Sequence, residues 1–209
     1  MSPRPRDPVL RANALSAAAR LLAEEGPSAL STRRLARELG VSTAAVYTYF
    51  GSIEQLRREV RLDGFARLES QLDSLGPSAD PVTDLSWIVR EFFEFGVRWP
   101  HLYRAMFVDR PPEEDTAGKP TFTRLIDLVR CGVDGNRFAA VAADQAELCA
   151  AQVWSMPHGM VTMVLSGALT ADAARAVLRD MVVRLAVGYG DDRRRAARSL
   201  HFVSTSGTK

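Results

Sequence analysis

One short stretch of the chain, residues 31–50, concentrates side chains that can contact a polyanion. Threonine and tyrosine hydroxyls and the arginine guanidinium donate hydrogen bonds to phosphate oxygens, and arginine also reaches base edges. Small alanine side chains let a backbone approach bases closely, and their methyl groups can pack on the C5 methyl of thymine. We therefore take as candidate DNA-binding residues Arg33, Thr43, Ala44, Ala45, Tyr47, Thr48 and Tyr49.

Two short helices must position these residues. Ser31 is typical of the N-cap of a helix that ends at Gly40, and Ser42 of the N-cap of a second helix whose inward positions are Val46 and Phe50. Two short helices joined by a tight turn fit a helix-turn-helix, which lays its second helix in the major groove. A corner of a helical bundle with the tyrosines in its core is the alternative interpretation.

Helix start and stop signals cover most of the remaining chain. Asp7-Pro8 predicts the start of a first helix and Gly26-Pro27 its end, while Ser52 with Gln55 forms a capping box for a long helix that ends before the breakers at 76–81. Apolar periodicity predicts further helices near residues 81–98, 101–108, 120–134, 142–167 and 171–189. The expected fold class is all-α, with about nine helices and a polar loop at 110–120.

The composition excludes several classes of protein. With 46% hydrophobic and 25% charged residues among 209, the chain can bury a core and is not disordered as a whole. Cys131 and Cys149 predict reduced thiols, and three scattered histidines give no metal site. Without a Gly-rich phosphate loop, a nucleophile elbow or paired carboxylates in an apolar setting, we expect no enzyme activity and no cofactor.

The charge distribution is compatible with a nucleic-acid partner, and the sequence shows neither a secretory signal nor a clear membrane span. Residues 1–60 hold nine arginines against six acidic residues, and residues 191–209 hold five basic against two acidic residues, which permits nucleic-acid binding without requiring it. The first residues lack the apolar region of a secretory signal, so we expect a cytoplasmic protein. Residues 148–171 carry no charge, but their polar residues favour a helix buried in protein, and another subunit could cover it, over a membrane span.

Aromatic and methionine residues at helical spacing could line a cavity for a hydrophobic or aromatic ligand, although such residues more often form an ordinary core. The candidate ligand-pocket residues are Phe92, Phe95, Trp99, Tyr103, Met106, Phe107, Phe122, Trp154, His158 and Met160. Pro157 is expected to kink its helix. For His158, a core or interface role is favoured over a ligand contact or a proton switch.

The stretch from Leu30 to Phe50, LSTRRLARELGVSTAAVYTYF, resembles the TetR family of bacterial transcriptional regulators, and the resemblance extends from about Val9 to Val60. Less specifically, WSMPHG at 154–159 is similar to an element in the effector domain of one TetR subgroup. Carried over position by position, the family's DNA contacts fall on the seven candidate residues named above. Two positions depart from the pattern, since Ile53 stands where many members have a phosphate-binding lysine and Tyr49 where many have histidine.

The resemblance implies an all-helical homodimer that binds a palindromic double-stranded DNA operator and a small-molecule effector, with the last two long helices at the dimer interface. It implies a helix-turn-helix domain at 1–52, a connecting helix at 53–76 and an effector-binding and dimerisation domain at 77–190. A basic tail at 191–209 is compatible with a frayed helix end or with disorder. Repression is the usual outcome in the family. A ligand-dependent activator and a helical protein-binding adaptor are the alternatives.

The missing lysine places some phosphate binding elsewhere in the chain. The candidates are Arg4, Arg6, Arg11, Arg57 and Arg58.

Overall fold

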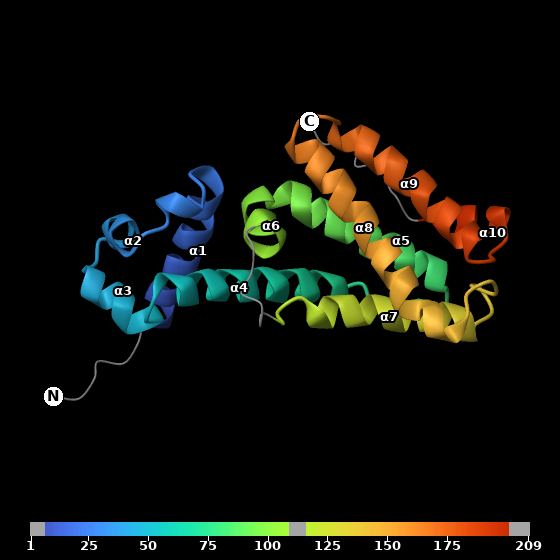
Figure 1. Ribbon diagram of the computed structural model, residues 1–209, viewed down its shortest axis with the longest axis horizontal. Coiled ribbons are helices and arrows are strands. Elements are labelled where there is room, and N and C mark those ends of the chain that lie inside the picture. The colour runs from blue at the N-terminus through green and yellow to red at the C-terminus, as the bar shows by residue number, and fades with distance from the viewer. Residues whose placement is uncertain (1–6, 109–115, 201–209) are drawn as a thin grey trace. The chain divides into compact units, whose positions relative to one another are not determined.

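The computed structural model describes residues 7–108 and 116–200, and in these ranges it is built of α-helices and two 3-10 turns without a strand (Figure 1). The all-α prediction is therefore confirmed. The chain divides into two compact units. One, called here the head unit, comprises residues 1–67 and 99–117, and the other, the body unit, comprises residues 68–98 and 118–209.

The head unit contains five helical elements besides the start of α4. They are α1 (Pro8–Glu24), the 3-10 turn η1 (Pro27–Ala29), α2 (Thr32–Leu39), α3 (Thr43–Phe50) and α6 (Pro100–Phe107). Asp7 caps α1, where its side chain accepts a hydrogen bond from the Val9 N–H at 2.9 Å. The helix starts predicted at Asp7-Pro8, Ser31 and Ser42 are thus confirmed.

The core of the head unit forms where α1 and the first part of α4 (Ile53–Asp73) meet α6. Gly64 of α4 allows a close approach there, because a Cβ at this position would lie 2.5 Å from the Met106 sulfur. Next to it, the buried Arg61 donates from Nε and Nη2 to the carbonyl of Met106, at 3.2 and 3.1 Å. Burial lowers the pKa of this guanidinium. These hydrogen bonds anchor the end of α6 to α4.

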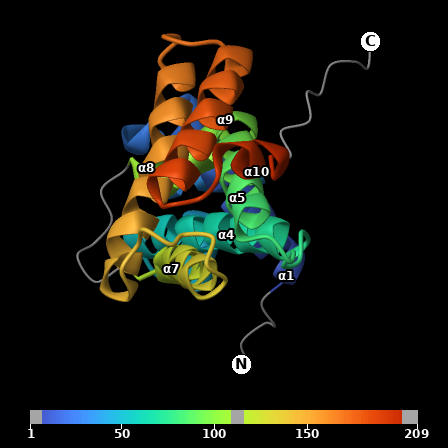
Figure 2. The same cartoon turned by 90° about the vertical axis from the view of Figure 1, so that its right-hand side faces the viewer.

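The body unit contains the longer helices, α5 (Pro81–Arg98), α7 (Lys119–Asp134), α8 (Ala146–Leu165) and α9 (Ala171–Gly188), with a 3-10 turn η2 (Ala143–Gln145) before α8. Helix α5 packs against α7, α8 and α9, and α8 lies beside α9 (Figure 2). The inward residues of α5, Val82, Leu85 and Val89, are fully buried. Gly132 of α7 makes room for Phe138, since a Cβ there would overlap the ring.

Two expectations need correction and a third stays open. The helix expected over 142–167 begins as the 3-10 turn η2, in which the Gln145 side chain accepts from the Ala142 N–H, and only then becomes α8. Pro157 lies inside α8, which continues to Leu165, and the kink expected there stays a prediction. A tenth helix, α10 (Arg193–Arg198), occupies part of the predicted tail, because the Asp192 side chain caps it by accepting from the Arg195 N–H at 2.9 Å. Residues 201–209 lie outside the described ranges.

Candidate DNA-binding and ligand-binding sites

Local hydrogen bonds hold α2 and α3 in place. The Ser31 hydroxyl accepts from the Arg34 N–H at 3.2 Å, and the Ser42 hydroxyl accepts from the Ala45 N–H at 3.1 Å. Gly40 ends α2 in the left-handed conformation, with φ at 66°, which glycine adopts without steric cost. Val46 and Phe50 of α3 are 5% and 4% exposed. The tight turn and the two inward positions were both predicted from the sequence.

The outer face of α3 carries the candidate DNA-binding residues. Thr43, Ala44 and Thr48 are exposed, Tyr47 is 56% exposed, and Ala45 is half-buried. The Thr48 hydroxyl donates to the Ala44 carbonyl at 2.8 Å and keeps its lone pairs for a donor. Except for Tyr49, these side chains lie on a surface that the described residues of the head unit leave open.

Tyr49 lies differently from the other candidates. It is half-buried, and its hydroxyl accepts from the backbone N–H of Asp7 at 2.9 Å, so it joins α3 to the start of α1. Its ring stands next to Phe50, with the centroids 6.3 Å apart. The Tyr49 O–H remains able to donate to a phosphate from this position.

The arginines of α2 divide into paired and unpaired ones. Arg34 forms an ion pair with Glu25 at 2.6 Å. Arg33 and Arg37 are exposed, lie four residues apart on the same helix face, and make no ion pair with any residue in the described ranges. Arg37 was missed by the sequence analysis, although its spacing of four from Arg33 predicts this shared face.

The phosphate-binding candidates are also unequal. Arg11 is engaged by Glu59 at 2.6 Å, Arg57 is half-buried, and Arg58 is exposed without an ion pair to the residues that the structure describes. Arg4 and Arg6 lie outside the described residues. Of the three that the structure describes, Arg58 is therefore the arginine whose charge is most available to an external anion.

The ten candidate ligand-pocket residues are divided between the two units. Trp99, Tyr103, Met106 and Phe107 belong to the head unit, where Tyr103 and Met106 are core residues and Trp99 is 41% exposed. The other six belong to the body unit: Phe92, Phe95, Phe122, Trp154, His158 and Met160.

Four of these residues form an aromatic cluster in the body unit. The Trp154 ring lies 5.2 Å from Phe92, 5.8 Å from Phe122 and 5.0 Å from His158, measured between centroids. Phe92 and His158 are 4.7 Å apart. Burial in this apolar setting lowers the pKa of His158 from 6.5 to about 4, so the imidazole is neutral at physiological pH. Its role as a ligand contact stays a prediction.

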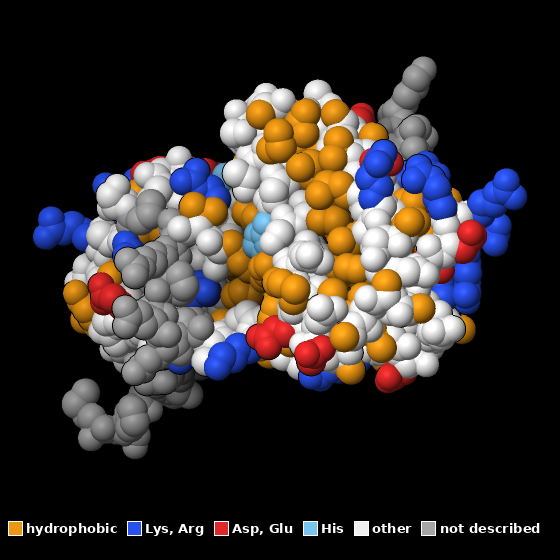
Figure 3. All heavy atoms as spheres, turned by 45° about the vertical axis from the view of Figure 1, so that its right-hand side comes forward, with side chains coloured by type: hydrophobic (Ala, Val, Ile, Leu, Met, Phe, Trp, Pro, Cys, Tyr) orange, Lys and Arg blue, Asp and Glu red, His pale blue; other side chains and the backbone are white. Residues whose placement is uncertain are grey.

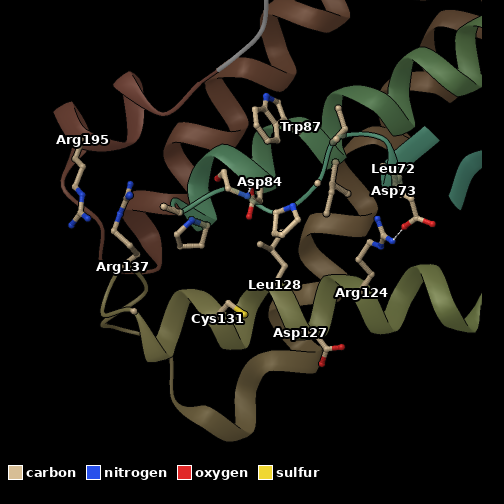
Figure 4. A pocket seen from close by; sticks show the side chains of 18 residues that line it. Leu72, Asp73, Asp84, Trp87, Arg124, Asp127, Leu128, Cys131, Arg137 and Arg195 are labelled. Atoms are coloured by element: carbon tan, nitrogen blue, oxygen red, sulfur yellow. Dashed lines mark hydrogen bonds and ion pairs between the residues drawn. The ribbon is translucent and has the colours of Figure 1, made fainter. Parts of the chain in front are cut away.

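A cavity of about 540 Å³ lies elsewhere in the body unit (Figure 4). It is bounded by the end of α4, the loop to α5, the first turns of α5, one face of α7 and Arg195 of α10. None of the ten candidate pocket residues lines it. Gly135 and Arg137, in the loop after α7, complete the wall. The sequence analysis missed this cavity because its wall comes from six segments, and no local pattern reveals that they are neighbours.

A buried charge network holds the segments around this cavity. Arg137 donates to both carboxylate oxygens of Asp191, at 3.0 and 2.6 Å, and to Asp80 at 2.5 Å. The Arg137 and Asp191 side chains are only 3% and 2% exposed. Ser199 donates to Asp80 at 2.6 Å. The network ties the start of α5, the loop after α7 and the two ends of α10 together.

An apolar surface runs along α8 and α9. Leu148, Met163 and Leu165 of α8 are 60%, 39% and 39% exposed, and Val177 and Val187 of α9 are 40% and 37% exposed. Figure 3 shows hydrophobic side chains gathered in a band on the surface of this unit. A Cβ at Gly159, between Leu148 and Met163 along the helix, would meet no atom within 4 Å. Exposed apolar bands of this kind mark protein–protein interfaces. In the described residues, no helix is long and apolar enough to cross a membrane.

The head unit thus presents two capped helices joined by a tight turn. The second helix, α3, carries hydroxyl and methyl groups on its open face, and the exposed arginines lie on α2 and α4. This arrangement is that of a helix-turn-helix DNA-binding protein. Comparison with known families agrees. Residues 14–60 match the model of bacterial regulatory proteins of the tetR family, and residues 85–185 match the tetracyclin repressor-like C-terminal domain. The chain belongs to the TetR family and is a transcriptional regulator.

Similar proteins are regulators too. An uncharacterized HTH-type transcriptional regulator of Mycobacterium tuberculosis, Rv0681, is 27% identical over 184 residues, which cover 85% of this chain and 80% of that protein. The TetR family regulator PfmR of Thermus thermophilus has a TM-score of 0.67 and 26% identity, over 82% of this chain and 97% of that one. A TetR variant of Acinetobacter baumannii AYE, solved with minocycline, has a TM-score of 0.60 and 21% identity, over 89% and 97%.

Proposed function

We propose that this regulator is a repressor that binds a pseudo-palindromic DNA operator as a homodimer and leaves it when a small molecule binds the body unit. The observation that carries the proposal is the open face of α3, with Tyr47 56% exposed beside exposed Thr43 and Ala44. A helix with this face can enter the major groove, where alanine and threonine methyls meet thymine and the hydroxyls meet phosphates.

The neighbouring cations supply the sequence-independent part of the affinity. Arg33, Arg37 and Arg58 are exposed and have no carboxylate partner in the part of the chain that the structure describes. Each can neutralise a phosphate without first breaking an ion pair. Arg11, by contrast, must give up Glu59 to do so. These three arginines can replace the lysine that many family members carry where this chain has Ile53.

The apolar surface of α8 and α9 supports the homodimer. Leu148, Met163 and Val177 are large hydrophobic residues on a band without charged residues on α8 between 148 and 165. Antiparallel contact of this band with its copy in a second chain would bury these side chains, in an isologous interface. In such a dimer each α3 acts as a recognition helix, the helix that enters the major groove. Two recognition helices one DNA turn apart match a palindromic operator.

The release mechanism is a coupling between two sites. Helix α4 contributes residues 53–67 to the head unit and residues 68–73 to the body unit, so it joins the two covalently. A ligand that binds one conformation of the dimer better than another shifts the equilibrium towards that conformation, by a free energy equal to the difference in binding free energy. The two conformations differ in the spacing of the α3 helices. The minocycline complex of the A. baumannii protein supports a small-molecule effector for this chain as well.

DNA binding is tested by fluorescence polarisation against fragments upstream of the gene and its neighbours, with random DNA beside them at low and near-physiological salt. Arg33→Ala and Tyr47→Ala should each weaken operator binding by about ten- to a hundredfold, the effect of losing one hydrogen bond to a charged phosphate. Arg130→Ala, an exposed arginine of the body unit with a side chain 61% exposed, serves as the matched control. Unchanged operator affinity in both head variants would contradict the DNA-contact assignment. An absence of specific binding to every fragment would favour the adaptor alternative.

The dimer is tested by sedimentation of Met163→Asp. An aspartate at this exposed position is tolerated by the single chain, but it would be a buried, unpaired charge in the interface and should yield monomers. Thr123→Asp on the exposed surface of α7 introduces the same charge away from the band and should leave the dimer intact. A stable Met163→Asp dimer would remove α8 from the interface.

A further inference from the structure

The cavity of the body unit has the size of a small-molecule site. Its volume of about 540 Å³ falls in the range of about 300–1,000 Å³ that such sites occupy. Apolar side chains make up most of the wall, with Leu72 from α4, Trp87 and Ile88 from α5 and Leu128 from α7. This wall suits a hydrophobic molecule.

Most charged groups of the wall are already engaged within the chain. Arg124 pairs with Asp73 and with Glu69, and Arg137 pairs with Asp80 and Asp191. Asp127 pairs with Arg130 at 3.3 Å. These groups shape the cavity but have little charge left for a ligand.

Asp84 is the exception among the carboxylates of the wall. Its Oδ1 accepts from the Ser78 N–H at 2.9 Å, and no arginine, lysine or histidine within the described ranges forms an ion pair with it. Trp87 follows three residues later on α5, a spacing that places the two residues on the same helix face, and both line the cavity. Figure 4 shows Asp84 and Trp87 on one side of the cavity, with Arg124 and Asp127 across from them.

A carboxylate beside an indole ring is suited to one class of ligand. An ammonium group gains a charge-assisted hydrogen bond from the carboxylate and a cation–π contact from the ring. Arg195 is the remaining cation of the wall without an ion pair to a described residue, but it is exposed, whereas Asp84 is half-buried. Solvent therefore screens Arg195 more than Asp84.

We propose that this cavity binds a hydrophobic organic cation, an amine whose ammonium contacts Asp84 and Trp87 and whose apolar body contacts Leu72 and Leu128. The cavity is thereby assigned as the effector site. That assignment rests on the proposed function, whereas amine binding to the cavity does not.

The test compares three probes that share one carbon skeleton and differ in charge: phenylbutylamine, phenylbutanol and phenylbutyrate. Each is titrated by calorimetry into the full chain at neutral pH, without DNA. The amine should bind at least about tenfold more tightly than the alcohol and the carboxylate. Asp84→Asn keeps an oxygen that accepts from Ser78 and should remove this preference, with alcohol binding changed by less than about threefold. Trp87→Leu should weaken the amine more than the alcohol.

Asp127→Asn is the matched control, because it removes an equal charge from a side chain that is 62% exposed and already paired. It should leave the preference for the amine in place. Tighter binding of the carboxylate would assign the site to Arg195 and overturn the proposal, and so would equal binding of the three probes or binding of none. The relative affinities of the three probes for the wild-type protein test the proposal even if the Asp84 variant fails to fold.

The effect on DNA is measured separately, by adding phenylbutylamine to the protein–operator complex. Amine binding with no release of DNA would reject the cavity as the effector site and leave the amine site standing. An absence of operator binding in the polarisation experiment would contradict the proposed function and leave the calorimetric result unaffected.

Discussion

The ion pairs of Arg20 and Arg34 in the head unit are far more exposed to solvent than the Arg137–Asp191 pair of the body unit. In the head unit the ion pairs are open to solvent: the side chains of Arg20 and Glu38 are 43% and 27% exposed, and those of Arg34 and Glu25 are 32% and 44% exposed. In the body unit, Arg137 and Asp191 are 3% and 2% exposed. Exposed pairs contribute up to about 1 kcal/mol to stability, whereas breaking a buried pair costs about 3–5 kcal/mol.

The exposure of a guanidinium decides whether the arginine can bind an external anion or instead holds the fold together. A solvated arginine such as Arg33 or Arg58 can turn to an external phosphate at little cost to the fold. Arg137 cannot, because its guanidinium connects Asp80, at the start of α5, to Asp191, before α10. Arginine-rich composition alone therefore does not identify a DNA-binding surface in this protein; burial of the guanidinium decides which arginines are available.

The largest effect is expected from Arg137→Ala. The substitution leaves Asp191 and Asp80 without their cation and should lower the free energy of unfolding by about 3–5 kcal/mol, measured in urea. Arg130→Ala removes an exposed arginine paired to Asp127, and it should change that free energy by less than about 1 kcal/mol. Similar losses in the two variants would contradict the contrast between buried and exposed pairs.

A smaller effect is expected from the titration of His158. Its pKa is lowered from 6.5 to about 4, so the unfolded chain binds a proton in a pH range where the folded chain does not. The contribution of neutral His158 to the free energy of unfolding is therefore fully present above about pH 6.5. It is lost as the pH falls towards 4, by up to about 3 kcal/mol. The slope should disappear from this window in His158→Gln. An unchanged pH dependence of urea unfolding in this variant would show that other groups cause it.

The smallest effect is expected at the turn before α3. Gly40 has φ at 66°, and a Cβ there would meet no atom within 4 Å, so Gly40→Ala tests backbone strain alone. Its expected cost is about 1–2 kcal/mol in thermal unfolding. Gly188→Ala, in helical conformation at the end of α9 with equally open space, should instead be neutral or stabilising by up to about 1 kcal/mol. Equal effects of the two substitutions would place the cost elsewhere than in φ.

Prediction from sequence was most successful where structure is local. Ser31, Gly40 and Ser42 act within a few residues of themselves through caps and a left-handed stop, and each lies where the pattern placed it. The helix-turn-helix and its open face follow from these positions. The ligand-pocket residues are different, because helical spacing alone could not tell that Tyr103 belongs to the head unit and Trp154 to the body unit.

The sequence by itself determined the all-α class, the position of the recognition helix and the family, because capping, helical periodicity and a characteristic order of residues are properties of neighbouring positions. Only the tertiary structure decided which charges are buried and where the cavity lies. Arg137 and Asp191 are 54 residues apart, and the cavity wall combines Leu72, Asp84, Leu128 and Arg195. Such groups meet because helices pack, and no interaction between sequence neighbours specifies that contact.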